Sequence, residues 1–154
     1  GFMMEYKCQQ LYRDARITSI YEGTTQLQTV AAIRYVTNGT YMSVIRDYEA
    51  IPVAEEYEGY MKRIKEMASK LEAVTNAVKD ANDQELLDFC ARKLYEMTAY
   101  TIMCHLLLQD TQKAPEMFAA SLNVFVNHAE SEVEKHFNYI RKMDAAQLAN
   151  YRKA

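Results

Sequence analysis

The chain has 154 residues, of which 49% are apolar, with four glycines, two prolines and a formal net charge of −3. This length allows one domain with its own hydrophobic core, and the scarcity of glycine and proline favours an all-α protein. The slightly acidic balance gives no electrostatic basis for binding nucleic acid, and no apolar run approaches the length that spans a bilayer. Since no basic leader with an apolar run opens the sequence, we expect a cytoplasmic protein.

The first predicted element is a short helix over residues 2–13, followed by a loop over residues 14–23. Gly23 permits a tight turn, and Thr24 is a good N-cap for the helix that follows. A single acidic side chain, Glu22, precedes this turn. Because backbone N–H groups at a helix start can bind an anionic group, the segment combines a proton acceptor with an anion site.

Taken by itself, a glutamate before Gly-Thr is most often a solvated acid that complements the helix dipole. The surrounding residues change this interpretation. Tyr-Arg-Asp-Ala-Arg-Ile at residues 12–17 and Ile-Tyr-Glu-Gly-Thr-Thr-Gln-Leu-Gln at residues 20–28 together resemble the C-terminal catalytic signature of the acyl-CoA dehydrogenases. The resemblance extends over roughly residues 1–36.

This resemblance implies that Glu22 is the catalytic base, which removes the α-proton of an acyl-CoA thioester. The β-hydrogen would leave as hydride to FAD, giving a trans-2-enoyl-CoA. Gly23 would lie against the substrate, and Thr24, Thr25 and Gln26 would contact FAD. A carboxylate suits this role because desolvation by flavin and acyl chain makes it more basic.

The resemblance also implies partners for the whole enzyme, which would be a homodimer that passes electrons to an electron-transfer flavoprotein. Members of the family carry two further domains before this signature. We therefore expect the chain to be the C-terminal piece of a longer protein, and to be inactive alone.

The next predicted helix covers residues 26–48, with Asn38-Gly39 as the one candidate for a break. Residues 49–52 form a linker that Pro52 closes. Beyond it, apolar residues recur at three- and four-residue steps in three long stretches, separated by turns at residues 80–83 and 109–114. Similar lengths and short connections predict an antiparallel up-down bundle of about four long helices.

This organisation predicts two parts. Residues 1–48 would be the C-terminal end of the catalytic domain, and residues 53–154 would be a C-terminal helical extension. Extended members of the family place such a domain where two dimers would otherwise join into a tetramer. Thr29 departs from the short-chain pattern, which often has arginine there, so contacts across a tetramer interface are in doubt.

A second hypothesis is that residues 53–154 form a dimerisation or docking module and that the signature is vestigial. The basic side chains at residues 62, 63, 65 and 70 raise the alternative of peripheral membrane contact, but interspersed glutamates favour a solvated face. A di-metal site in a bundle uses Glu-x-x-His, and no histidine of the chain has glutamate three residues before it. We therefore predict no metal site.

Overall fold

The fold is all-α, as the composition predicts. The computed structural model describes residues 5–18, 21, 23–143 and 145–151. Within these residues the chain forms α-helices and one 3-10 turn, and none of them lies in a β-strand. The elements, in chain order, are α1 (Cys8–Ile17), α2 (Thr25–Thr37), α3 (Thr40–Glu49), η1 (Glu55–Tyr57), α4 (Glu58–Asp80), α5 (Gln84–Lys113), α6 (Pro115–Arg141) and α7 (Ala145–Tyr151).

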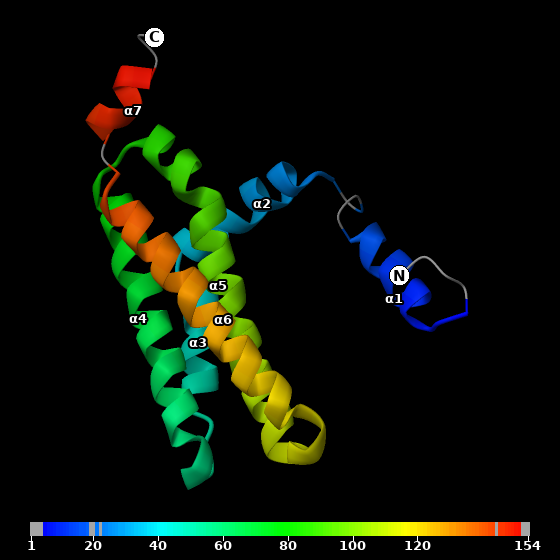
Figure 1. The fold of residues 1–154 in the computed structure, drawn as a ribbon. Helices are drawn as coiled ribbons and strands as arrows, with labels where there is room; N and C mark the ends of the chain where they lie inside the picture. The colour runs from blue at the N-terminus through cyan, green and yellow to red at the C-terminus, as the bar shows by residue number, and fades with distance from the viewer. Residues whose placement is uncertain (1–4, 19–20, 22, 144, 152–154) are drawn as a thin grey trace.

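Three long antiparallel helices, α4, α5 and α6, form the body of the molecule (Figure 1). The turn after α4 places Asn82 at φ 48°, a left-handed backbone that asparagine tolerates. The carboxylate of Asp83 then caps α5 by accepting from the N–H groups of Glu85 at 2.9 Å and Leu86 at 3.1 Å. Pro115 begins α6, where its missing N–H costs no helical bond. The predicted bundle and its turn at residues 80–83 are confirmed, but the turn predicted at residues 109–114 is wrong, because α5 continues to Lys113 and only Ala114 separates it from α6.

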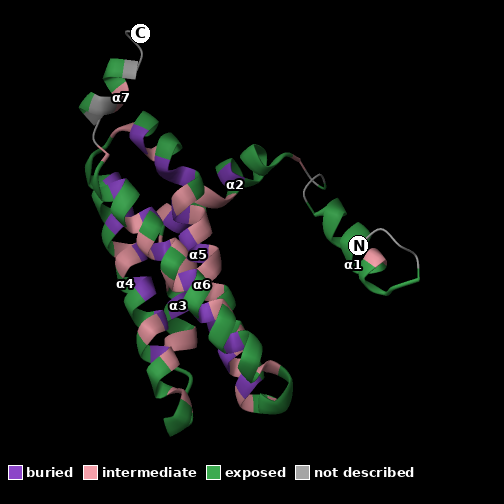
Figure 2. Ribbon diagram, viewed as in Figure 1, coloured by how far each residue is buried: buried purple, intermediate pink, exposed green. Residues whose placement is uncertain are grey.

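The buried residues follow the apolar stripes of the long helices (Figure 2). Each helix turns one face inward and leaves the other in water, as the three- and four-residue spacing predicts. The largest completely buried apolar side chains are Ile45, Ile64, Met67, Leu71, Val74, Leu94, Met97, Leu108, Leu122, Val126 and Val133. All but the first belong to α4, α5 and α6, so these three helices supply most of the core.

The fourth position of the bundle is filled by a broken helix. The prediction of one helix over residues 26–48 is wrong, because the chain turns at Gly39, whose φ is +86°. Asn38 stabilises the turn, since its Oδ1 accepts from the N–H of Thr40 at 3.0 Å and from its hydroxyl at 2.8 Å. Beyond the turn, α3 packs against α4 and α5 and buries Ile45 completely.

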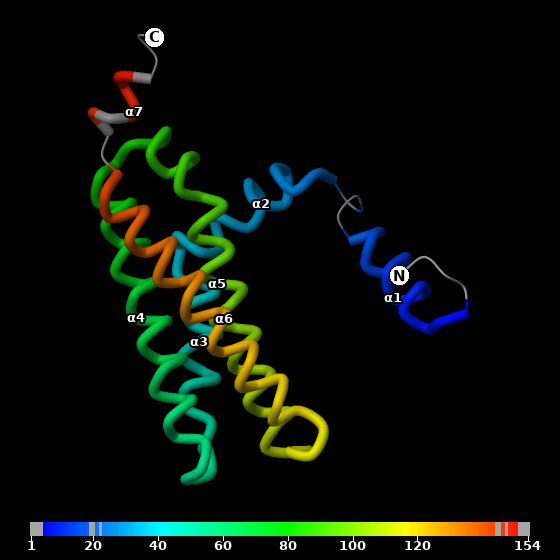
Figure 3. Tube along the Cα trace, viewed as in Figure 1, coloured from blue at the N-terminus to red at the C-terminus, as the bar shows by residue number. Residues whose placement is uncertain are grey.

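The helix α1 lies apart from the bundle, at the end of an arm that continues from α2 (Figures 1 and 3). None of its residues is buried. The predicted loop over residues 14–23 is wrong at its start, because α1 continues to Ile17. Residues 14–17 contain no helix breaker, and the hydroxyl of Thr18 closes the last turn by donating to the carbonyl of Ala15 at 2.7 Å.

Ion pairs tie α6 to α4 on the surface. Arg63 lies 2.6 Å from Glu130, and Lys70 pairs with Glu134. Two cations of the basic side of α4 are thus bound to carboxylates of the neighbouring helix. In the described ranges, none of the helices has both the length and the apolar character that crossing a membrane requires.

Candidate functional site

The predicted site lies at the start of α2. Glu22, the predicted base, lies outside the described residues. Gly23 adopts φ +114°, a conformation that side chains with a Cβ rarely take. A Cβ at this position would also come within 3.2 Å of Cδ1 of Leu27. The backbone angle therefore favours glycine here, and a side chain would in addition require Leu27 to move by a few tenths of an ångström.

Two side chains stabilise the N-terminus of α2 through hydrogen bonds. Thr24 has the extended backbone of an N-cap, at φ −70° and ψ 162°, and its hydroxyl accepts from the N–H of Leu27 at 3.4 Å. From the next turn, Nε2 of Gln28 donates to the carbonyl oxygen of Tyr21 at 3.0 Å. The chain on both sides of Glu22 is thus bound to the first turns of α2.

The predicted cofactor contacts share this helix start. Thr24, Thr25 and Gln26 are all exposed, so their polar groups face outward. The first N–H groups of any α-helix have no carbonyl partner within the helix, and they carry its positive dipole end. Oxyanions and polar ring edges are suitable ligands for such a surface, so these residues fit the phosphate-bearing flavin that the resemblance implies.

The opposite side of α2 is anchored on the bundle. Thr29 is only 3% exposed, and its hydroxyl donates to the carbonyl of Thr25 at 2.8 Å. Leu27 and Val30 lie on the outer side, where 61% and 57% of each residue is exposed. The buried position of Thr29 explains the departure from the short-chain pattern, because an arginine here would place its charge against the bundle.

The arginine–aspartate group of the motif belongs to a separate helix. Arg13, Asp14 and Arg16 lie on α1, and all three are exposed. The described residues therefore place together the helix-start part of the predicted site, and they place the upstream part on a separate helix.

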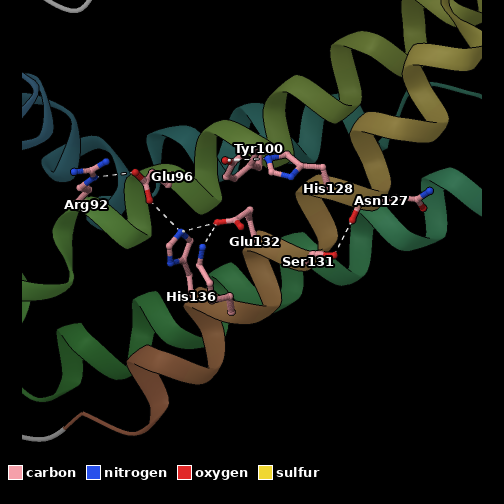
Figure 4. A network of polar contacts seen from close by, with 9 residues as sticks. Arg92, Glu96, Tyr100, Asn127, His128, Ser131, Glu132 and His136 are labelled. Carbon is pink, nitrogen blue, oxygen red and sulfur yellow. Dashed lines mark hydrogen bonds and ion pairs between the residues drawn. The ribbon is translucent and has the colours of Figure 1, made fainter.

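A second polar cluster joins α5 to α6 (Figure 4). Arg92 donates to Glu96 at 2.8 Å. Across the helix interface, Nε2 of the buried His136 lies 3.0 Å from the carboxylate of Glu96. Within α6, the same nitrogen lies 3.9 Å from the carboxylate of Glu132. In the same cluster, the hydroxyl of Tyr100 of α5 lies 3.5 Å from Nε2 of His128 of α6.

Sequence reasoning missed this cluster, because it depends on the register of two helices. The spacing of Arg92 and Glu96 is visible in the sequence, but their partner His136 is 40 positions further along the chain. Burial lowers the pKa of His136, and the carboxylate of Glu96 opposes the shift. The described residues contain no group of histidine, cysteine and acidic side chains arranged to hold a metal ion.

Buried groups in the core are poor nucleophiles and bases. Burial raises the pKa of the Cys104 thiol to about 12, so the thiolate that would react is scarce at neutral pH. Burial lowers the pKa of His105 to about 4, and its ring stacks on Tyr48 with 5.7 Å between centroids. Their chemistry is that of neutral packing groups.

In comparisons with known proteins, two family models together match residues 1–148 of the chain. A family model described as "Acyl-CoA dehydrogenase C terminal" matches residues 37–148. A second model, "Acyl-CoA dehydrogenase, C-terminal domain", matches residues 1–36. The crystal structure of an acyl-CoA dehydrogenase family protein from Porphyromonas gingivalis is similar, with a TM-score of 0.69 and 36% sequence identity. The similarity covers 74% of this chain and 98% of that one.

Curated relatives match over shorter stretches. An acyl-CoA dehydrogenase of Bacillus subtilis is 42% identical over 40 residues, which are 26% of this chain and 11% of the relative. An acryloyl-CoA reductase (NADH) of Anaerotignum propionicum is 47% identical over 36 residues, 23% of this chain and 9% of the relative. The chain thus matches about a tenth of the length of these two relatives.

Proposed function

The chain belongs to the acyl-CoA dehydrogenase family, and we propose that it forms the C-terminal part of a flavin-dependent enzyme that oxidises acyl-CoA thioesters to trans-2-enoyl-CoA. The observation that carries this proposal is the turn at Gly23. There the signature meets the open N-terminus of α2, with a positive φ that favours glycine.

In this proposal the carboxylate of Glu22 takes the α-proton of the thioester. The proton is weakly acidic, so the acceptor must be close, and burial against the acyl chain would raise its basicity. As the proton leaves, negative charge grows on the thioester oxygen, and backbone N–H donors placed there would lower the barrier.

The other residues of the proposed site would bind and orient the substrate and the cofactor. Gly23, which has no side chain, would let the substrate approach the backbone. Thr24, Thr25 and Gln26 would hold FAD through their exposed polar groups and the N–H donors of the helix start. When bound, the flavin supplies the acceptor for the hydride that leaves the β-carbon.

We also propose the assembly that the family implies: a cytoplasmic homodimer that passes electrons to an electron-transfer flavoprotein. The division into a catalytic part (residues 1–48) and an extension (53–154) belongs to the same proposal. A break in helical structure supports it, since α3 ends at Glu49 and η1 begins at Glu55. The two parts share a core, because Ile45 of α3 packs among the long helices.

The test uses the full-length protein, in which the catalytic domains precede this chain. Glu22→Gln removes the base and keeps the side-chain size, so we expect flavin binding to persist while exchange of the substrate α-proton falls at least about a hundredfold. Glu55→Gln, at an exposed acid of η1, is the matched control and should leave exchange unchanged. Near-normal turnover by the Glu22 variant would refute the assignment.

The rival function, a docking module, has one observation in its favour. Several apolar residues of α5 and α6 are exposed: Met103, Leu106, Met117 and Val124 are between 43% and 69% exposed. If these residues serve self-association, the full-length protein without residues 53–154 should change its sedimentation coefficient. If the full-length protein with Glu22 intact also showed no exchange of the substrate α-proton, this rival would replace the enzymatic proposal.

A further inference from the structure

Tyr21, the residue before the proposed base, is bound at both of its backbone groups. Its N–H donates to the carbonyl of Ile17, the last residue of α1, at 2.8 Å. Its carbonyl oxygen accepts from Nε2 of Gln28 on α2 at 3.0 Å. Tyr21 therefore connects the end of one helix to the start of the next, and the bond to α2 comes from a side chain.

The residue after the proposed base adds conformational freedom. Gly23 has no Cβ, so its backbone can rotate more widely than that of other residues. Beyond it, Thr24 is bound to α2, because its carbonyl accepts from the N–H of Gln28 at 3.1 Å. This downstream bond alone does not fix the backbone from which the side chain of Glu22 extends, since Gly23 lies between them.

One residue thus makes contacts on both sides of Glu22. The backbone N–H of Gln28 binds Thr24, and its side-chain amide binds Tyr21. Only two residues, Glu22 and Gly23, lie between these two points of attachment. A segment this short, bound at both ends, has few conformations, whereas without the bond to Tyr21 it would be held by α2 at one end only.

We propose that Gln28 is a positioning residue for the acyl-CoA dehydrogenase reaction, which holds the backbone around Glu22 so that its carboxylate reaches the α-proton. The inference rests on the proposed role of Glu22 as the base. Proton abstraction from carbon needs the acceptor in a narrow range of positions, and a misplacement of about 1 Å can cost about a hundredfold in rate. Gln28 acts through the backbone and takes no part in the proton transfer.

The bond to Tyr21 needs a side chain at position 28 that is long and that donates. Glutamine carries a neutral NH₂ donor at the end of a flexible chain. Methionine has a similar length but no donor, and glutamate has the same shape but presents only acceptors to a carbonyl when ionised. Lysine supplies a donor again, so these three replacements separate the loss of the bond from a change in size.

The experiment measures exchange of the substrate α-proton by the full-length protein. Gln28→Met should lower kcat about tenfold, with KM and flavin content unchanged, because only the placement of the base is lost. Gln28→Glu should lower kcat at least as much, and Gln28→Lys should recover most of the loss. Gln84→Met is the matched control, since it removes another exposed glutamine bond, of 2.7 Å to Asp88 in α5, and should leave exchange unchanged.

A second measurement tests the bond itself in the 154-residue chain. The NMR resonance of the Tyr21 carbonyl carbon should move in Gln28→Met and stay in place in Gln84→Met, because only the first variant removes its donor. This result is independent of the proposed enzymatic function.

The positioning role is overturned if the Tyr21 resonance does not move, or if Gln28→Met exchanges the α-proton at the unaltered rate. A loss of flavin, or a rise in KM with kcat unchanged, would indicate a binding role and would also overturn it. If the unaltered full-length protein showed no exchange, the proposed function and this inference would fall together. If it did exchange and the Gln28 variants matched it, only the positioning role would fall.

Discussion

The N-terminal arm and the helical bundle are both α-helical, but they differ in what their side chains contact. In α5 eleven residues are buried, whereas in α1 none is. Leu11 and Ile17 of α1 are 69% and 50% exposed, although they are apolar. An isolated helix of ten residues is marginal in water, because its stability in proteins comes mainly from packing.

The difference shows which segment supplies the core. The bundle buries its own apolar stripes, and Val36 and Ile33 of α2 pack with them. The arm leaves the apolar side chains of Leu11 and Ile17 exposed.

The largest predicted effect comes from replacing one leucine by alanine in each region and comparing the two losses of stability. Leu94 of α5 is fully buried, so Leu94→Ala should lower the free energy of unfolding by roughly 3–4 kcal/mol through lost contacts and a cavity. Leu11→Ala in α1 should change it by less than about 0.5 kcal/mol. Urea denaturation followed by circular dichroism measures both. Equal losses would mean that α1 is packed in solution.

A second prediction uses the buried His105 of the bundle. Burial holds its pKa near 4, below the ordinary 6.5, so the unfolded chain takes up a proton at a higher pH than the folded chain. Stability should therefore fall as the pH drops from 6.5 toward 4, by at most about 3 kcal/mol.

The measurement for His105 is a set of urea denaturations between pH 8 and pH 4. His105→Phe keeps an aromatic ring beside Tyr48 and removes the titrating group, so its stability should fall less steeply over the same interval. Parallel curves for the variant and the unaltered chain would contradict the assignment of this pH dependence to His105.

The smallest predicted effect compares the N-caps of the two regions. Asp83 caps α5 with two contacts, at 2.9 and 3.1 Å, whereas Thr24 caps α2 with one contact of 3.4 Å. Asp83→Ala should cost about 1 kcal/mol of unfolding free energy, and Thr24→Ala less than about 0.5 kcal/mol. Thermal and urea unfolding of the two variants will show whether the bundle cap is the stronger one.

Helical periodicity was sufficient to predict the bundle. The stripes of α4, α5 and α6 were correctly expected to be buried, because side chains three and four residues apart share a helix face. The turn at residues 80–83 was correctly placed, since the N-cap Asp83 acts over one or two positions, whereas the turn expected at residues 109–114 was placed too early, because α5 continues to Lys113. The signature around Glu22 likewise indicated the family, which the comparisons confirm.

The sequence by itself therefore determined the helices, the inward faces and the family, all of which depend on residues close together in the chain. Only the tertiary structure decided that the elbow at Gly39 folds α3 onto α4 and α5, that Thr29 is buried, and that His136 of α6 meets Glu96 of α5. These features depend on how separate helices pack, and the spacing of residues within one helix carries no information about the register of its neighbour.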